Sequence, residues 1–142
     1  MRLSWKSVFT CFGGIEVGVL NQAICVFLGA GCGALLRWRL GVWSGQMWPS
    51  FPPGTLLANL AGCLLIGLAA GWFESRPEIS QATRLLVTTG FLGGFTTFSA
   101  FSLETVALLS ERPALAFLIV VGKLTACLAL TYAGMALMRR AL

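Results

Sequence analysis

The sequence predicts an all-α membrane protein with four transmembrane helices, and two observations carry this prediction. Of the 142 residues, 57% are hydrophobic and only 11% are charged, whereas soluble domains carry roughly 25% charged residues. A helix needs about 20 apolar residues to cross a membrane. The chain contains four apolar stretches of about that length or longer, and short segments with proline or charged residues separate them. We therefore expect one domain, residues 1–142, with helices at about 21–40, 54–73, 82–109 and 114–138.

The charged residues exclude several classes of function. The chain has five acidic residues and no histidine, so a catalytic triad that uses histidine is excluded, and we expect no enzyme activity. A metal site of imidazoles or paired carboxylates is nearly excluded for the same reason. The net charge of +5 would suggest nucleic acid in a soluble protein, but here the basic residues flank apolar segments, where they set orientation. We expect membrane lipid, and no nucleic acid, as a partner.

The cysteines are expected to act as small buried hydrophobic side chains. All five lie in apolar surroundings and none forms a CxxC pair, so a disulfide framework is not expected. They are Cys11, Cys25, Cys32, Cys63 and Cys127.

Residues 1–20 are interpreted as an N-terminal extension. Arg2 and Lys6 precede an apolar run, as in a signal peptide, but no cleavage site of small residues follows. Val17 or Val19 is an alternative start of the chain, because valine codons can serve as starts.

The first helix, 21–40, contains small residues one turn apart at Gly29 and Gly33, which let another helix approach closely in lipid. It ends in Arg37-Trp38-Arg39, a cation and aromatic anchor at the membrane interface. The following segment, 41–53, contains tryptophans and prolines and is expected to be an interfacial connection.

The second helix, 54–73, carries one strongly polar side chain, Asn59. In one interpretation, Asn59 forms a hydrogen bond to another helix, which contributes on the order of 1 kcal/mol. The other reading makes it a donor that faces an ion path. The residues alone leave the two readings open.

The third helix, 82–109, is expected to be interrupted near Gly93–Thr97. Its stretch GFLGGFTTFSAFSLE, 90–104, places Gly93-Gly94 and Thr96-Thr97 at the middle of an apolar segment. Glycine weakens a helix interior, and threonine hydroxyls offer the backbone other partners. Non-helical backbone at membrane depth is tolerated where protein buries it or where it lines a water-filled path. The stretch therefore predicts an ion path.

Two kinds of ion fit this stretch. The positive ring edges of Phe98 and Phe101, with the hydroxyls of Ser99 and Ser102 beside them, suit a small anion. An unwound turn at the glycines and threonines would instead free carbonyl oxygens for a cation such as Na⁺. A plain kink, with threonine bonded back to the helix, is the alternative.

The balance of positive charge across the membrane is nearly even. With four spans, the N-terminus, the loop between the second and third helices and the C-terminus share one side. Without the extension, the two sides carry four and three cations: Arg76, Arg84, Arg139 and Arg140 against Arg37, Arg39 and Arg112. The positive-inside rule then barely chooses an orientation, so the chain is able to insert both ways and pair antiparallel with itself.

Three blocks of sequence resemble the Fluc/CrcB family of fluoride channels. They are GAGCGALLRWRL (29–40), GTLLANLAGCLLIG (54–67) and GFLGGFTTFSAFSLE (90–104). Their order and spacing fit, and the resemblance extends from about Asn21 to the C-terminus. It implies a passive, fluoride-selective channel that exports fluoride from the cytoplasm and lowers its toxicity. It also implies an antiparallel, dual-topology homodimer in the bacterial inner membrane, with two fluoride pores and one central Na⁺ that is structural and not transported.

The resemblance assigns roles to residues by motif position. Gly93 and Thr96 would supply Na⁺ with backbone carbonyls from both subunits. The ion pathway would contain ring edges, an amide, hydroxyls and an arginine near the vestibule: Phe98, Phe101, Asn59, Thr97, Ser99, Ser102, Thr125 and Arg37.

Two features depart from the family pattern. The N-terminal extension is not typical of it, and Lys123 stands in the fourth helix where the family tends to have serine or asparagine. A lysine at membrane depth is costly unless it finds water or a partner, so Lys123 either faces the pore and alters anion binding or extends to the interface.

The alternative function is a small proton-coupled multidrug exporter, another class of four-helix, dual-topology protein. It requires a membrane-embedded carboxylate. Glu16 is the candidate within an apolar run, while Glu104 and Glu111 lie near the end of the third helix. A third reading, a packing subunit without transport, leaves the interruption of the third helix unexplained.

Overall fold

A computed structural model describes residues 18–48 and 53–142 of the chain. The expected N-terminal extension, including Glu16 and Cys11, therefore lies almost entirely outside the described residues. The elements within them are all helical: α2 (Val19–Met47), α3 (Gly54–Ser75), α4 (Gln81–Leu85), η1 (Leu86–Leu92), α5 (Gly93–Phe95), α6 (Phe98–Glu111) and α7 (Pro113–Ala141).

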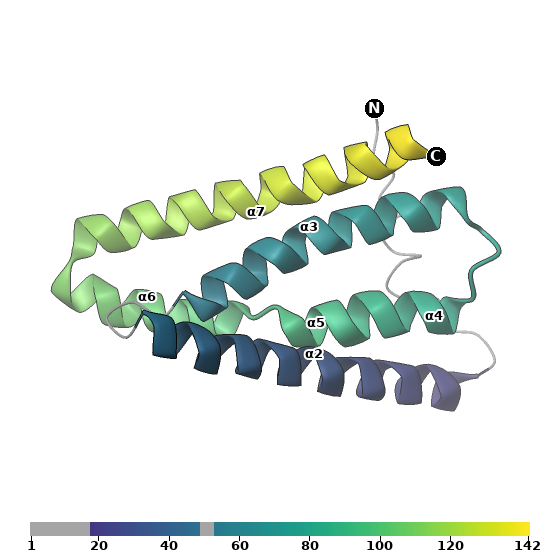
Figure 1. Cartoon of the computed structure of the whole chain (residues 1–142), viewed down its shortest axis with the longest axis horizontal. Coiled ribbons are helices and arrows are strands. Elements are labelled where there is room, and N and C mark those ends of the chain that lie inside the picture. Colours follow the sequence, from purple (N-terminus) through teal and green to yellow (C-terminus); the bar gives the residue numbers. More distant parts are fainter. Residues whose placement is uncertain (1–17, 49–52) are drawn as a thin grey trace.

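The described chain runs along its long axis four times in alternating directions (Figure 1). Four helical segments are long and apolar enough to cross a membrane: α2, α3, the run Gln81–Glu111 from α4 to α6, and α7. The end of α2, the start of α3 and the turn between α6 and α7 lie at one end of the molecule. The opposite end holds the turn between α3 and α4 and the C-terminus. This is the all-helical, four-span architecture predicted from the composition.

Helix α2 continues to Met47, beyond the expected end at residue 40. No proline occurs between residues 21 and 48, so nothing in the sequence stops the helix at residue 40. The helix ends where Trp48 precedes a proline in the sequence, because a residue before proline disfavours the helical conformation. The extra turns bring α2 against the start of α3. A Cβ at Gly54 would lie 2.7 Å from both the Gly41 Cα and the Ser44 Oγ.

The predicted close approach at Gly29 and Gly33 is confirmed. A Cβ at Gly29 would lie 2.5 Å from the Leu86 carbonyl oxygen, and one at Gly33 would overlap the Phe91 carbonyl oxygen. Any larger side chain would therefore push α2 away from η1. These two glycines hold the first span against the segment that precedes the interruption.

Helices α3 and α7 form a second close pair. Gly67 and Gly134 each face the backbone of the other helix, and a Cβ at Gly134 would lie 2.5 Å from the Leu64 carbonyl oxygen. The Thr131 hydroxyl donates to the Cys63 carbonyl across this interface at 3.0 Å.

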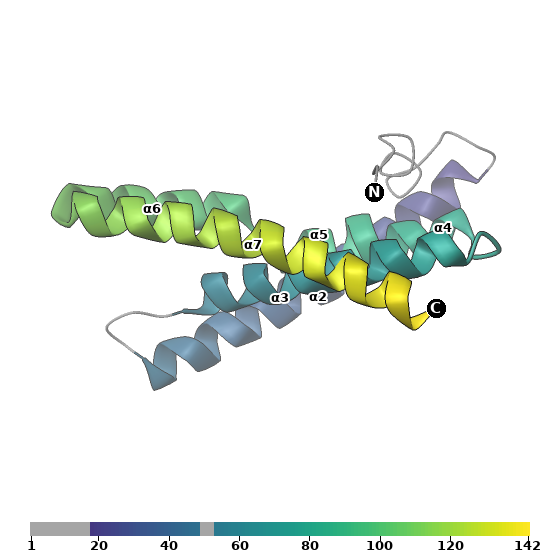
Figure 2. The same ribbon diagram turned by 90° about the horizontal axis from the view of Figure 1, so that it is seen from above.

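The third span is interrupted at Thr96 and Thr97, within the predicted region. Both residues are extended, with φ and ψ of −86° and 157° at Thr96 and −152° and 123° at Thr97. Gly93 remains helical, and the preceding turns of η1 are π-helical. Figure 2 shows the consequence: beyond the interruption, α6 and the first half of α7 diverge from α2 and α3.

Candidate ion pathway

Asn59 of α3 spans the interruption in the third helix with two hydrogen bonds. Its amide nitrogen donates to the Thr97 carbonyl at 2.9 Å, and its amide oxygen accepts from the Thr97 N–H at 2.8 Å. The side chain is 9% exposed. One amide therefore replaces backbone partners that the extended conformation of Thr97 cannot provide. The amide nitrogen carries a second hydrogen, which this pair does not use.

The Asn59 pair also changes the bonding of Gly93. In an uninterrupted helix, the Thr97 N–H would donate to the carbonyl four residues earlier, at Gly93. Here it donates to Asn59 instead, and no loop hydrogen bond of the described residues reaches that carbonyl. The break therefore releases a carbonyl oxygen at membrane depth.

The Thr96 carbonyl has a partner from the first span. The Arg37 guanidinium, half-buried in α2, donates to it at 3.5 Å. The Thr96 hydroxyl donates to the Leu92 carbonyl at 2.9 Å, which ends the helix before the break. The Thr96 side chain therefore caps the end of α5, while its carbonyl accepts from the Arg37 guanidinium.

A cavity of about 480 Å³ lies against the interruption. Its lining includes six of the ten residues singled out from the sequence: Asn59, Gly93, Thr96, Thr97, Phe98 and Phe101. The tertiary structure therefore brings together the amide of α3 and both phenylalanines of α6.

The two phenylalanines differ strongly in exposure. Phe98 is 71% exposed on the single chain, whereas Phe101 is 6% exposed. Their ring centroids are 5.7 Å apart with an interplanar angle of 66°. In such an edge-to-face pair the positive edge of one ring meets the negative face of the other, and the exposed ring of Phe98 is accessible from outside the single chain.

The other predicted residues lie outside this cavity. The Ser99 hydroxyl is 3.1 Å from the Thr97 hydroxyl, and Ser102 donates to the Phe98 carbonyl at 3.0 Å. Thr125 is exposed on α7, and Arg37 is on α2. The Thr97 hydroxyl accepts from the Ala100 N–H at 3.3 Å, so it caps the start of α6.

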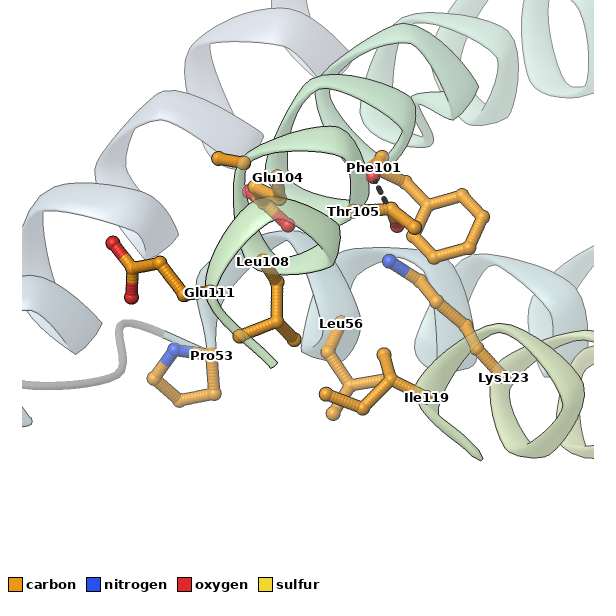
Figure 3. Close-up of a pocket in the computed structure, with 10 residues that line it drawn as sticks. Pro53, Leu56, Phe101, Glu104, Thr105, Leu108, Glu111, Ile119 and Lys123 are labelled. Atoms are coloured by element: carbon orange, nitrogen blue, oxygen red, sulfur yellow. Dashed lines mark hydrogen bonds between the residues drawn. The ribbon is translucent and has the colours of Figure 1, made fainter. Parts of the chain in front are cut away.

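A second cavity, of about 620 Å³, lies where α6 and α7 diverge from the start of α3. Figure 3 shows its lining, with Lys123 extending from α7 toward the Phe101 ring and Thr105 of α6. The Lys123 Nζ lies 4.0 Å from the centroid of that ring. The two cavities share only Phe101 and Lys123.

Thr89 is a further residue of the candidate site that the sequence did not predict. Its hydroxyl oxygen is buried, makes no hydrogen bond within the described residues and belongs to the lining of the smaller cavity. A threonine within a helix normally donates to the carbonyl four residues earlier, as Thr88 does to Arg84 at 2.8 Å. The π-helical turn that contains Thr89 is not predicted by any local pattern in the sequence.

The remaining polar groups of the described residues are not arranged for transition-metal chemistry. No group of three or more cysteine or acidic residues there could hold a metal ion. The four described cysteines are free, and Cys32 is exposed on the single chain, contrary to the expectation of burial. That expectation rested on local apolar character, which does not distinguish a core from a face toward lipid.

Comparisons with known proteins show which family the chain resembles. The family described as "CrcB-like protein, Camphor Resistance (CrcB)" matches residues 24–135. A protein of Pseudomonas putida named "Fluoride-specific ion channel FluC" is 50% identical over 93 residues, which cover 66% of this chain and 73% of that protein. Proteins of the same name from Chromobacterium violaceum and a Methylobacterium species are 47% and 49% identical, over 82% and 78% of this chain and 93% and 90% of their own lengths.

The family match covers more than half of the chain. It includes the second and third spans in full, most of the first and fourth, and every residue of the candidate pathway. The protein is a multi-pass membrane protein with bacterial relatives. It belongs to the CrcB-like family.

Proposed function

We propose that the protein is a fluoride-specific ion channel that lets fluoride leave the bacterial cytoplasm passively and so lowers its toxicity. The observation that carries this proposal is the cavity at the interruption, which joins Asn59 to Phe98 and Phe101, in a chain about half identical to proteins named fluoride-specific ion channels.

The chemistry of the cavity suits a small, strongly hydrated anion. Such an ion leaves water only where other donors replace its hydration shell, and conduction requires that the replacement stay weak. The unused amide hydrogen of Asn59, the buried hydroxyl of Thr89 and the ring edges of Phe98 and Phe101 are donors of that strength. Thr97, Ser99, Ser102 and Thr125 are further hydroxyls near the path.

The single chain supports an antiparallel homodimer as the working form. Phe98 is 71% exposed beside the interruption, and a pore residue needs a wall that a second copy would supply. The nearly even distribution of positive charge, four cations against three without the extension, allows both orientations in the membrane. We infer a dual-topology dimer in the inner membrane, with two paths related by symmetry.

A structural Na⁺ between the two copies fits the carbonyls of Gly93 and Thr96. The Gly93 carbonyl is released by the Asn59 pair. A Cβ at Gly93 would meet nothing closer than 3.6 Å, at the Thr88 carbonyl, so packing within one chain does not require glycine there. Close approach of a second copy provides a reason. The ion would neutralise the facing carbonyls and take no part in transport.

Arg37 and Na⁺ compete for the Thr96 carbonyl. Two cations on one oxygen repel each other, so we expect Arg37 to release Thr96 when Na⁺ binds. The freed guanidinium would then draw anions toward the path, the role that the family resemblance implies for Arg37. Arg37 lies beside the interruption, ten residues before the end of α2, and not at the helix end expected of an interfacial anchor.

A proton-coupled exporter has less support. It requires a membrane-embedded carboxylate. Glu104, midway along α6, and Glu111, at its end, are both exposed on the single chain. The Glu104 carboxylate accepts a hydrogen bond from Thr55. Glu16 lies outside the described residues, and removing residues 1–18 should leave fluoride transport intact.

The test is fluoride efflux from liposomes that contain the purified protein. We expect rapid efflux of fluoride and little efflux of chloride from matched vesicles. Absence of fluoride flux, or equal chloride flux, would contradict the proposal.

A further inference from the structure

Lys123 is a buried cation within the fourth span. The side chain is 7% exposed. From Pro113 at the start of α7, the rise of 1.5 Å per residue puts Lys123 roughly 15 Å from the turn between α6 and α7, about half of the ~30 Å hydrocarbon core. An ammonium group at this depth is costly unless water or a partner compensates it.

No carboxylate of the described residues forms a close ion pair with Lys123, although the Glu104 carboxylate attracts it across the larger cavity. The ion pairs there join Arg76 to Glu78 and Arg139 to Glu74. Glu104 lines the larger cavity with Lys123, but its carboxylate accepts a hydrogen bond from Thr55. The contact of the Lys123 ammonium is the face of the Phe101 ring, 4.0 Å from its centroid. A cation on a ring face is held in place but keeps its three N–H donors for other acceptors.

Lys123 lies where the two cavities meet. The cavity of about 480 Å³ at the interruption and the cavity of about 620 Å³ between α3 and α6 share only Lys123 and Phe101 among their lining residues. An ion that passes from one cavity to the other therefore passes these two side chains. The ammonium occupies one face of the Phe101 ring, so an anion beside it meets the ring at its edge.

We propose that Lys123 is a fixed anion-binding residue at the junction of the two cavities, and that it sets how tightly this channel holds fluoride. This inference rests on the proposed function. A charge-assisted hydrogen bond from the ammonium to fluoride is stronger than one from a neutral hydroxyl or amide. Tighter binding lowers the fluoride concentration that half-saturates the flux and slows release, because conduction requires an ion to leave as well as enter.

The test compares three variants in the liposome efflux assay over a range of fluoride concentrations. Lys123→Met removes the charge but keeps a chain of similar length, and Lys123→Arg keeps a charge. Arg140→Met is the matched control, because it removes an exposed cation of α7 that lines neither cavity and leaves three cations on each side of the membrane. We expect Lys123→Met to raise the half-saturating fluoride concentration by about tenfold or more, with Lys123→Arg and Arg140→Met close to the parent protein.

A purely structural role would lower the number of active channels without moving the half-saturating concentration. An unchanged value in Lys123→Met would therefore overturn the inference, as would an equal rise in Arg140→Met.

A separate measurement distinguishes this inference from the proposed function. If the parent protein carries no fluoride, the channel proposal fails, and thermal unfolding in detergent still tests the anion site. Sodium fluoride should raise the midpoint of unfolding relative to sodium gluconate at equal ionic strength, and Lys123→Met should lose that rise. An equal rise in both proteins would overturn the assignment of Lys123.

Discussion

Replacement of Asn59 by aspartate tests the interruption most directly. The carboxylate still accepts from the Thr97 N–H, but it has no hydrogen to donate to the Thr97 carbonyl, which now lies 2.9 Å from the amide nitrogen. A buried carbonyl left without its partner costs about 1–3 kcal/mol. A fixed negative charge about 4 Å from fluoride adds roughly 4 kcal/mol of repulsion at an effective dielectric constant of 20, or about a thousandfold in occupancy of the path. We expect Asn59→Asp to lower fluoride flux by two orders of magnitude or more.

The assay is fluoride efflux from liposomes, with the assembled dimer measured by size-exclusion chromatography. Thr131→Val is the matched control, because it also removes a hydrogen bond from a side chain to a backbone carbonyl across a helix pair, that of Cys63, and the Thr131 side chain lines neither cavity. It should lower stability by about 1 kcal/mol and leave flux per folded dimer unchanged. Parent-like flux in Asn59→Asp, or an equal loss in both variants, would refute the reasoning.

Three further predictions test the packing, the path and the cation site. Gly33→Ala should destabilise the protein by about 1–3 kcal/mol, because its Cβ would overlap the backbone of η1. Gly31→Ala, whose Cβ would meet nothing within 4 Å, should unfold thermally at nearly the parent midpoint. Equal midpoints of the two variants would contradict the close approach at Gly33. Phe98→Ile should reduce fluoride efflux at least about tenfold, through loss of the ring edges, while the dimer still assembles, and unreduced flux would remove Phe98 from the path. Gly93→Ala should fold, since its Cβ meets nothing nearer than 3.6 Å, but should lose the stabilisation of the dimer by sodium over N-methylglucamine; an undiminished sodium effect would contradict the proposed site.

Several features followed from the sequence because they depend on local composition. Four long apolar stretches must become helices in lipid, where every backbone group needs an internal partner. The glycines one turn apart at Gly29 and Gly33 predict a close helix contact wherever the partner lies. The run of glycines and threonines predicts an interruption, because those residues stabilise a helix interior least.

The role of Asn59 could not be read from the sequence, which left two readings open. The structure supports a hydrogen bond between helices and, in the same side chain, a place in the lining of the cavity. The two readings are compatible, because the backbone that this amide bonds lies beside the same cavity, and the role of Asn59 in an ion path stays a prediction. That pairing joins residues far apart in the chain and depends on the register between two spans, which no local pattern encodes.

The sequence by itself determined the four spans, the region of the interruption and the family motifs, because each depends on neighbouring residues. Only the tertiary structure decided that the break falls on Thr96 and Thr97 and leaves Gly93 helical. It also decided that Lys123 lies over the Phe101 ring between two cavities. The physical reason is that a freed backbone group or a buried charge takes its partner from another helix, and which partner is in reach is set by how the helices pack.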